Sequence, residues 1–368
     1  MITVEHVANW LQQFAPVGLA ESWDHVGLLL GDPATRLERV MTCLTVTEAT
    51  AQEAVTERVG LVVSHHPILF RDARQIRADL PGTAAVWALA RAGISVYSPH
   101  TALDHTAGGI NDVLCRRFGL VDCVPLRLLP GPSSFKVVVF TPESDRDSVL
   151  EAAFAAGAGR IGRYSECSFA TPGEGTFFGS EESQPAVGQK GRRETVVELR
   201  LEVVCPAERL ASVLSAIRGR HSYEEPAIDV YPLHTPPDGR GAGRIGRYLE
   251  PRPLSEFAAI VAANLGHVRV QQVGDPGRKV QKVAVVCGAG DDFIGDAAAA
   301  DADVLVTGEA RFHRVLEAEA LGIGLILAGH YATERPGVEE LARRIAGTFP
   351  DLQVWPSQFE RDPLRASH

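Results

Sequence analysis

The sequence predicts an α/β protein in which two similar halves form one domain and a smaller α+β domain is inserted between them. Strand-like and helix-like segments alternate from residue 38 to residue 100 and again from residue 282 to residue 345. Such alternation is typical of parallel strands joined by crossover helices. With 368 residues and 45% hydrophobic content, the chain is long enough for two domains with sizeable cores.

The two halves are expected at residues 1–130 and 238–368. In the first half, β-branched runs and helical runs predict a strand at 38–46, a helix at 47–58, a strand at 60–66, a helix at 84–93 and a strand at 94–100. The same order returns in the second half, with a strand at 282–290, a helix at 291–301, a strand at 303–309, a helix at 312–322, a strand at 324–330 and a last helix at 336–345. Each half is therefore expected to be a β-α-β-α-β unit.

Residues 131–237 are expected to form an inserted β-α-β-β-α-β module of ferredoxin type. The segment begins after the turn-rich L-L-P-G-P-S-S and ends in the loop H-T-P-P-D-G-R-G. The expected elements are a strand at 135–142, a helix at 148–157, a Gly-, Ser- and Glu-rich stretch to about residue 193, a strand at 195–205, a helix at 208–218 and a strand at 227–233.

The octapeptide G-A-G-R-I-G-R-Y occurs twice, at 157–164 and 241–248. Neither copy lies between a strand and a helix as a phosphate-binding loop requires, so we interpret its glycines as turn residues. The flanks of the two copies share nothing, which argues against a duplicated domain.

Composition and charge narrow the classes of function. Lys and Arg number 36 against 46 Asp and Glu, a formal net charge of -10, which disfavours broad attraction to nucleic acid or anionic lipid. The first residues do not have the pattern of a signal peptide, and no run approaches the roughly 20 apolar residues of a membrane span. The six cysteines lie far apart without a C-x-x-C pair, so we expect reduced thiols in a cytoplasmic protein.

Histidines and carboxylates follow three of the expected strands. His65 and His66 end the apolar run L-V-V-S-H-H-P, and Y-S-P-H-T-A-L-D-H places His100 and Asp104 just past the next strand. In the second half, G-L-I-L-A-G-H-Y-A-T-E-R-P ends a strand with a histidine and adds a glutamate four residues later. Ligands bind at the carboxyl ends of strands in open α/β sheets, so we expect these side chains to share one rim.

We interpret His65, His66, Asp104, His330 and Glu334 as ligands of a dinuclear metal centre. Imidazole nitrogen and carboxylate oxygen bind zinc, iron and manganese, and five ligands suit two ions with a bridging carboxylate and water. Such a pair of divalent ions would produce a hydroxide nucleophile near neutral pH. Pro336 is expected to confine the segment around the last two ligands to a helix start and to exclude the middle of a helix.

Each of these residues also has an ordinary structural interpretation. One of the two adjacent histidines could cap a turn while the other is solvated, and Asp104 alone could be a turn residue. Glu334 could favour the N-terminus of the helix that follows. The recurrence at three strand ends favours metal binding. The isolated histidines His6, His234, His267 and His368 are assigned no role.

The motifs S-H-H-P, S-P-H-T-A-L-D, G-G-I-N-D, T-G-E-A-R-F-H and G-H-Y-A-T-E-R resemble the Nif-three-like family, whose bacterial members are called GTP cyclohydrolase 1 type 2 homologs. S-W-D-H-V-G is similar to the family's W-D-N-x-G segment. The resemblance implies a dinuclear centre on the same five ligands. H-S-Y-E-E-P-A-I-D-V-Y-P-L is similar to the PII-like or CutA-like domain of long family members. The resemblance also implies a homohexameric toroid with metal sites facing an internal cavity.

The chain departs from the family pattern at positions that are not ligands. Thr45, His25, Ala102 and Glu309 stand where the family more often has Asp, Asn, Asn and Asp, respectively. We therefore expect substrate contacts, and not the metal centre, to differ.

Two functions are favoured at this point. The first is a metal-dependent hydrolase acting on a nucleotide or a related small molecule, with His100 or His313 as the proton carrier. The second is a non-catalytic metal-binding, metal-delivery or regulatory protein whose inserted domain senses a small effector. Two divalent ions per subunit, a small-molecule partner, and neither membrane nor direct nucleic-acid binding are expected in both cases. The resemblance to eukaryotic relatives also suggests a third, a partnership with transcription or nucleic-acid machinery, although the acidic charge argues against direct DNA binding.

Overall fold

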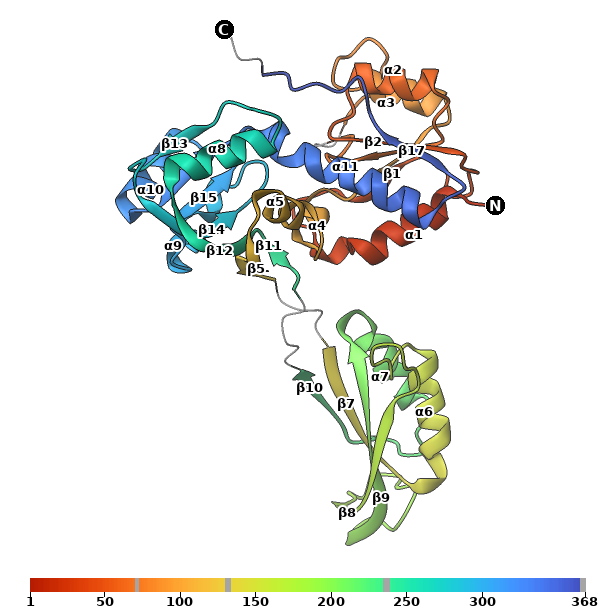
Figure 1. Ribbon diagram of the computed structural model, residues 1–368. Coiled ribbons are helices and arrows are strands. Elements are labelled where there is room, and N and C mark those ends of the chain that lie inside the picture. Colours follow the sequence, from red (N-terminus) through yellow and green to blue (C-terminus); the bar gives the residue numbers. More distant parts are fainter. Residues whose placement is uncertain (70–72, 130–133, 234–238, 365–368) are drawn as a thin grey trace. The chain divides into compact units, whose positions relative to one another are not determined.

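The computed structural model describes residues 1–69, 73–129, 134–233 and 239–364, and the chain separates into two compact units. The main unit contains residues 1–129 and 239–368, and the inserted unit contains residues 130–238 (Figure 1). The centres of the two turn-rich connections, 130–133 and 234–238, lie outside the described residues. Among the helices of the described residues, none has the length and apolar character needed to cross a bilayer.

The first sheet of the main unit has the strand order β1-β4-β3-β2-β17. Its strands are β1 (Gly27–Leu30), β2 (Arg39–Cys43), β3 (Leu61–Ser64), β4 (Ser95–Ser98) and β17 (Gln353–Pro356), and all but β1 run parallel. Successive residues point to opposite faces: Val62 packs toward α2 (Glu48–Thr56) and α3 (Ala84–Arg91), and Val63 packs toward α1 (Val4–Phe14) and α11 (His330–Thr348). Both faces are covered, which explains the continuous apolar runs.

The second sheet has the order β13-β16-β15-β14-β12-β5. Its strands are β5 (Val121–Val124), β12 (Arg244–Pro253), β13 (Gln271–Val273), β14 (Lys279–Val285), β15 (Val304–Thr307) and β16 (Gly324–Leu327). The parallel strands β14, β15 and β16 lie between α8 (Leu254–Asn264) on one face and α9 (Ile294–Ala299) and α10 (Phe312–Leu321) on the other. The order of elements predicted for both halves is thus confirmed.

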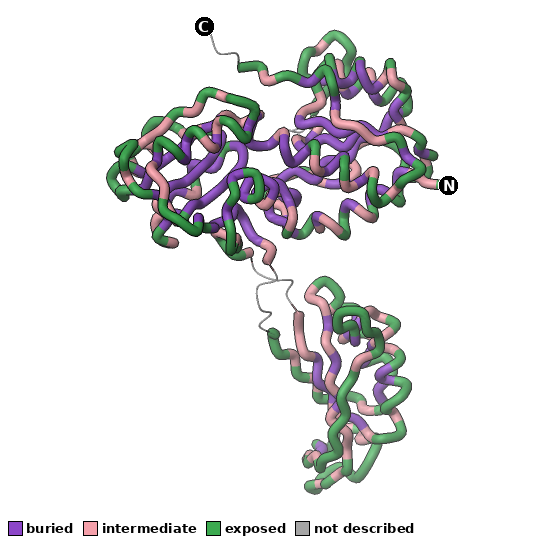
Figure 2. Tube along the Cα trace, in the orientation of Figure 1, coloured by how far each residue is buried: buried purple, intermediate pink, exposed green. Residues whose placement is uncertain are grey.

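The two sheets share one core and exchange edge strands. One buried cluster contains Val63 of the first sheet and Val306 of the second, and Figure 2 shows the buried residues concentrated along the strands of both. β17, from the end of the chain, extends the first sheet beside β2, while β5, from the first half, extends the second sheet beside β12. The sequence did not predict either edge strand. Short α4 (His100–His105) and α5 (Ile110–Phe118) follow β4, and the short ribbon of β6 (Arg127–Leu128) and β11 (Gly241–Ala242) completes the main unit.

The inserted unit has the predicted order of elements, β-α-β-β-α-β. They are β7 (Ser134–Thr141), α6 (Arg146–Ala155), β8 (Ser168–Phe178), β9 (Arg193–Pro206), α7 (Leu210–Arg218) and β10 (Ile228–Leu233), in an antiparallel sheet of order β10-β7-β9-β8. No strand was assigned within the Gly-rich stretch, where β8 lies. β8 is an edge strand and most of its residues are exposed, so Pro172 and its neighbouring glycines are tolerated there.

The segment that contains His330 and Glu334 lies at a helix start, as Pro336 predicted, but the helix begins six residues before the expected start at residue 336. α11 begins at His330 and continues through Pro336 to Thr348. A proline near the N-terminus of a long helix removes only the hydrogen bond to the carbonyl four residues earlier, and the packing of α11 on β2 and β17 outweighs that loss. His330 and Glu334 consequently lie one turn apart on the same helical face.

Candidate metal centre

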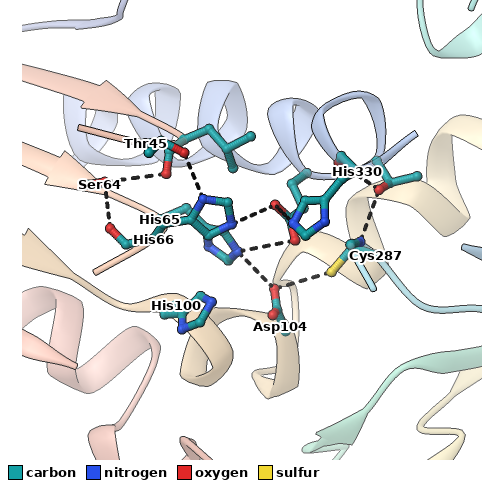
Figure 3. A network of polar contacts seen from close by, with 12 residues as sticks. Thr45, Ser64, His65, His66, His100, Asp104, Cys287 and His330 are labelled. Carbon is teal, nitrogen blue, oxygen red and sulfur yellow. Dashed lines mark hydrogen bonds and ion pairs between the residues drawn. The ribbon is translucent and has the colours of Figure 1, made fainter. Parts of the chain in front are cut away.

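The expected ligands come from loops that follow strands of both sheets. His65 and His66 lie directly after β3, and Asp104 lies in α4, which begins two residues after β4. His330 and Glu334 lie in the first turns of α11, after β16 of the second sheet. The carboxyl ends of the strands in the two sheets therefore face the same site, where the sequence predicted a single rim. Figure 3 shows His65, His66, Asp104 and His330 turned toward one another.

Glu334 lies at the centre of the cluster. Its Oε2 atom is 3.1 Å from Nε2 of both His66 and His330, and its Oε1 atom is 3.8 Å from Nε2 of His65. His65 Nε2 is also 3.7 Å from Asp104 Oδ1. All five ligands predicted from the sequence are thus brought together, with one carboxylate between imidazoles on both sides.

Two groups of side chains in this cluster could each hold a metal ion. One comprises His65, His66 and His100, and the other comprises His66, His330 and Glu334, with the candidate ligand atoms in each group within 4.8 Å of one another. The two groups share His66. This arrangement offers imidazole nitrogen and carboxylate oxygen, the donor set of zinc and iron(II).

The outer nitrogen of three imidazoles is held by a neighbouring side chain. His66 Nδ1 is 2.8 Å from Thr45 Oγ1, His330 Nδ1 is 3.0 Å from Glu309 Oε1, and His100 Nδ1 is 2.7 Å from Asp24 Oδ1. An N–H donated from Nδ1 to a carboxylate places the lone pair of the ring on Nε2, which is the atom that accepts a proton or binds a cation. This is the usual outer support of metal-binding histidines.

Several polar atoms in the centre are shielded from solvent without a hydrogen-bond partner. They are both ring nitrogens of His65, Nε2 of His330 and Oε2 of Glu334. His65 is 1% exposed and Glu334 is 4% exposed. Buried polar groups are nearly always satisfied, and a bound cation would satisfy the nitrogen lone pairs and the carboxylate together. The residues present therefore fit a metal ion.

The electrostatics of the centre keep its carboxylate ionised. Burial alone would raise the pKa of Glu334, but the adjacent His330 and His65 imidazoles hold it well below its usual range. The Glu334 carboxylate, 3.1 Å away, raises the pKa of His330 to about 9, and burial lowers the pKa of His66. A buried carboxylate that stays charged and lies between imidazoles is a ready ligand for a divalent cation.

Gly288 has no side chain, which makes room for the Glu334 carboxylate. Its φ is +62°, and a Cβ atom there would lie 2.2 Å from Glu334 Oε1 and 3.3 Å from His330 Nε2. Next to it, the Cys287 thiol donates to Asp104 Oδ1 at 3.3 Å. Burial raises the pKa of that thiol well above its usual range, so it stays protonated and can donate.

His100 is held in a constrained position at the start of α4. Its φ is +31°, uncommon for a residue with a side chain, and its backbone N–H donates to the His65 carbonyl at 3.2 Å. Asp24, whose side chain is 1% exposed, accepts from His100 and from the Thr101 hydroxyl. The His100 ring lies 5.2 Å from the His65 ring, centroid to centroid.

The two candidate proton carriers are placed differently. His100 lies within the cluster, whereas His313 is exposed on α10, where its ring is 5.6 Å from the Phe312 ring.

The sequence did not predict the contributions of Asp24, Cys287 and Gly288. Asp24 could have been found from the W-D-H-V-G segment, whose resemblance to a family motif marked it. Nothing in the local pattern of V-C-G-A-G indicated contact with the ligands.

Comparison with known proteins agrees with this architecture. The family model described as Duf34/NIF3 (NGG1p interacting factor 3) matches residues 2–363. The chain is 38% identical over 372 residues to the GTP cyclohydrolase 1 type 2 homolog of Mycobacterium tuberculosis, covering 100% of this chain and 98% of that protein. It is 41% identical over 347 residues to the protein of the same name from Mycobacterium leprae, covering 93% of this chain and 90% of that protein.

Solved structures give the same result. A Bacillus cereus protein related to NIF3 superposes with a TM-score of 0.76 at 31% identity, covering 100% of this chain and 99% of that one. Staphylococcus aureus protein SA1388 has the same fold, with a TM-score of 0.83 at 24% identity and coverage of 100% and 99%. The chain therefore belongs to the DUF34/NIF3 family.

Proposed function

We propose that this protein is a metal-dependent hydrolase in which His65, His66, Asp104, His330 and Glu334 hold two divalent ions. The observation that carries the proposal is the set of buried atoms without hydrogen-bond partners, namely the ring nitrogens of His65, Nε2 of His330 and Oε2 of Glu334. A pair of divalent cations, when bound, supplies Lewis acidity toward water and toward a substrate oxygen. Zinc, iron and manganese all fit this donor set.

His100 is the proton carrier in this proposal. Because its Nδ1–H donates to the buried Asp24 carboxylate, its Nε2 is the atom that can take a proton from the attacking water. The same atom can return that proton to the leaving group. Asp24 fixes the tautomer and favours the imidazolium that forms, as a carboxylate does beside any catalytic histidine.

The proposed substrate is a nucleotide or a related small molecule. Support comes from the name shared by the bacterial relatives, GTP cyclohydrolase 1 type 2 homolog, and from Trp23. The Trp23 side chain is 58% exposed, and its ring lies edge to face with His100 at 6.0 Å. An exposed aromatic ring beside the proton carrier provides a surface on which a planar base can stack.

The alternative is a non-catalytic metal-binding or regulatory protein. The inserted unit, which forms a separate compact body with its own cavity, favours a sensing role. In either case we propose a PII-like or CutA-like inserted domain, a homohexameric assembly and a cytoplasmic location, which rest on the family resemblance and on the reduced cysteines.

The test is a hydrolysis screen on protein purified without chelators and loaded with zinc, iron(II) or manganese. Wild type, His66→Ala, His100→Gln and the control His313→Gln are compared on GTP, other nucleotides, phosphodiesters and cyclic amides. We expect His66→Ala to lose metal and turnover, and His100→Gln to lose turnover by about 100-fold or more. Metal retained by His100→Gln supports the proton-carrier role, whereas metal lost by it identifies His100 as a ligand of the group that it forms with His65 and His66. His313→Gln should behave as wild type. Reversible metal binding without turnover on any substrate would favour the regulatory alternative.

A further inference from the structure

The inserted unit contains a cavity of about 680 Å³, within the size range of small-molecule sites. It lies where β8 and β9 leave the helix-covered part of the sheet, between the 179–187 connection and the 223–227 loop. Its wall includes Phe140, Phe177 and Tyr223 together with Glu198. All the lining residues belong to the inserted unit, so this cavity is distinct from the candidate metal centre.

The charged residues that line the cavity are all acidic. Glu182, Glu198, Glu224 and Glu225 line it, and no Lys or Arg is among its lining residues. The Arg200 guanidinium lies 5.9 Å from the ring of the lining residue Phe140 and donates to Glu202 at 3.0 Å. Arg200 is thus already neutralised by its own partner. An anionic ligand would meet four uncompensated carboxylates.

Glu198 and Tyr223 place polar atoms inside the cavity. The Glu198 carboxylate lies against Gly175 of β8, where a Cβ atom would be 2.1 Å from Glu198 Oε2. The Tyr223 hydroxyl is shielded from solvent without a hydrogen-bond partner. Burial and the neighbouring Glu198 carboxylate raise the pKa of Tyr223, so its hydroxyl stays protonated. An ammonium group placed between the half-buried Glu198 carboxylate and the shielded Tyr223 hydroxyl can donate to an oxygen of each.

Contacts of His221 and Gln184 hold the loop that carries Tyr223 in place. His221 contacts the Phe140 carbonyl through Nε2 at 2.9 Å and accepts from the Tyr223 backbone N–H through Nδ1 at 3.0 Å. The Gln184 backbone N–H donates to Glu224 at 3.1 Å, which ties the 179–187 connection to the same loop. The backbone that carries Tyr223 and Glu224 is therefore held in position before any ligand binds, which lowers the entropic cost of binding.

We propose that this cavity binds an organic cation, namely a protonated amine carried on an aromatic or apolar body. The ammonium group lies at the Glu198 carboxylate and the Tyr223 hydroxyl. The body of the ligand packs on Phe140 and Phe177, whose ring faces also attract the positive charge. The combination of an aromatic wall with carboxylates and no basic residue selects this class over anions and over neutral molecules.

The experiment uses the full-length protein and three probes that share one aromatic body: phenethylammonium, 2-phenylethanol and phenylacetate. Binding is measured by isothermal titration calorimetry at pH 7. We expect saturable binding of phenethylammonium, binding of the neutral alcohol at least about tenfold weaker, and none of the anion. Glu198→Gln should weaken phenethylammonium binding about tenfold or more, and Tyr223→Phe severalfold.

The control variant is Glu151→Gln, which removes an exposed carboxylate from α6 of the same unit. It should bind phenethylammonium as wild type does. Melting temperatures of the unliganded variants separate loss of binding from loss of folding. Three results would overturn the proposal: no binding of phenethylammonium by wild type, phenylacetate binding as tight as that of the amine, or Glu198→Gln binding unchanged. Displacement of the amine by Mg²⁺ alone in the micromolar range would instead identify an inorganic cation site and would equally overturn it.

Discussion

Replacing Gly288 by alanine should remove metal from the centre while leaving the fold intact. The new Cβ atom would lie 2.2 Å from Glu334 Oε1, well inside the separation at which two non-bonded atoms touch. The carboxylate must then move, and because Glu334 is 4% exposed and contacts His66 and His330 at 3.1 Å, any movement takes it out of the centre. The positive φ of +62° adds a backbone cost of about 1 kcal/mol.

Gly93→Ala is the matched control. Gly93 also has a positive φ, +68°, but no atom lies within 4 Å of the Cβ that alanine would add. Gly93→Ala should therefore lose about 1 kcal/mol of unfolding free energy in chelator, as measured by urea denaturation, and Gly288→Ala should lose at least as much, because it also displaces the buried Glu334 carboxylate. Only Gly288→Ala should lose affinity for zinc, on the order of 100-fold, as measured by competition with a chromogenic chelator. Unchanged zinc affinity in Gly288→Ala would refute the assignment of Glu334 as a ligand.

Three further predictions concern residues around the centre. Thr45→Val removes the contact to His66 Nδ1 and should lower zinc affinity roughly tenfold without altering the melting temperature of the chelated protein; unchanged affinity would contradict this outer-partner role. Arg244→Leu leaves the Asp112 carboxylate and buried carbonyls without their donor, so urea denaturation should show a loss of roughly 3 kcal/mol, and a loss below 1 kcal/mol would contradict it. For Asp24, burial alone would raise the pKa, but hydrogen bonds from His100 and Thr101 lower it from 3.8 to about 2. Because the folded value is the lower one, Asp24 should stabilise the fold by roughly 2 kcal/mol above pH 4, and that contribution should be lost as the pH falls toward 2. The difference in unfolding free energy between wild type and Asp24→Asn should therefore shrink from pH 7 to pH 3, and a difference that does not change with pH would contradict it.

The rule that ligands bind at the carboxyl ends of strands in open α/β sheets was enough to predict from the sequence that these side chains lie together. His65 and His66 directly follow an apolar β-branched run, and that local pattern fixes both the end of β3 and the position of the two imidazoles. Asp104 and Glu334 were reached by the same argument at other strands. The relation between the two sheets was not predictable, because it depends on a core shared by residues as far apart in sequence as Val63 and Val306.

The remaining differences come from tertiary contacts that override local signals. Asp24 precedes β1 and reaches His100 across 76 residues, so its role has no local signature beyond the motif that it belongs to. Pro336 was interpreted from its intrinsic helix-breaking tendency, yet it lies inside α11, whose packing compensates for the lost hydrogen bond. β5 and β17 are short edge strands with partly exposed residues, which lack the apolar run of a central strand.

The most direct test of the central claim is the number of metal ions per chain. Protein prepared without chelators is dialysed to equilibrium against zinc or manganese, and metal is determined by elemental analysis against amino-acid analysis of the same sample. We expect two ions per chain for wild type and a loss of both in His66→Ala, because His66 belongs to both groups of candidate ligands. Wild-type protein that holds no ion, or one at saturation, would contradict the dinuclear centre.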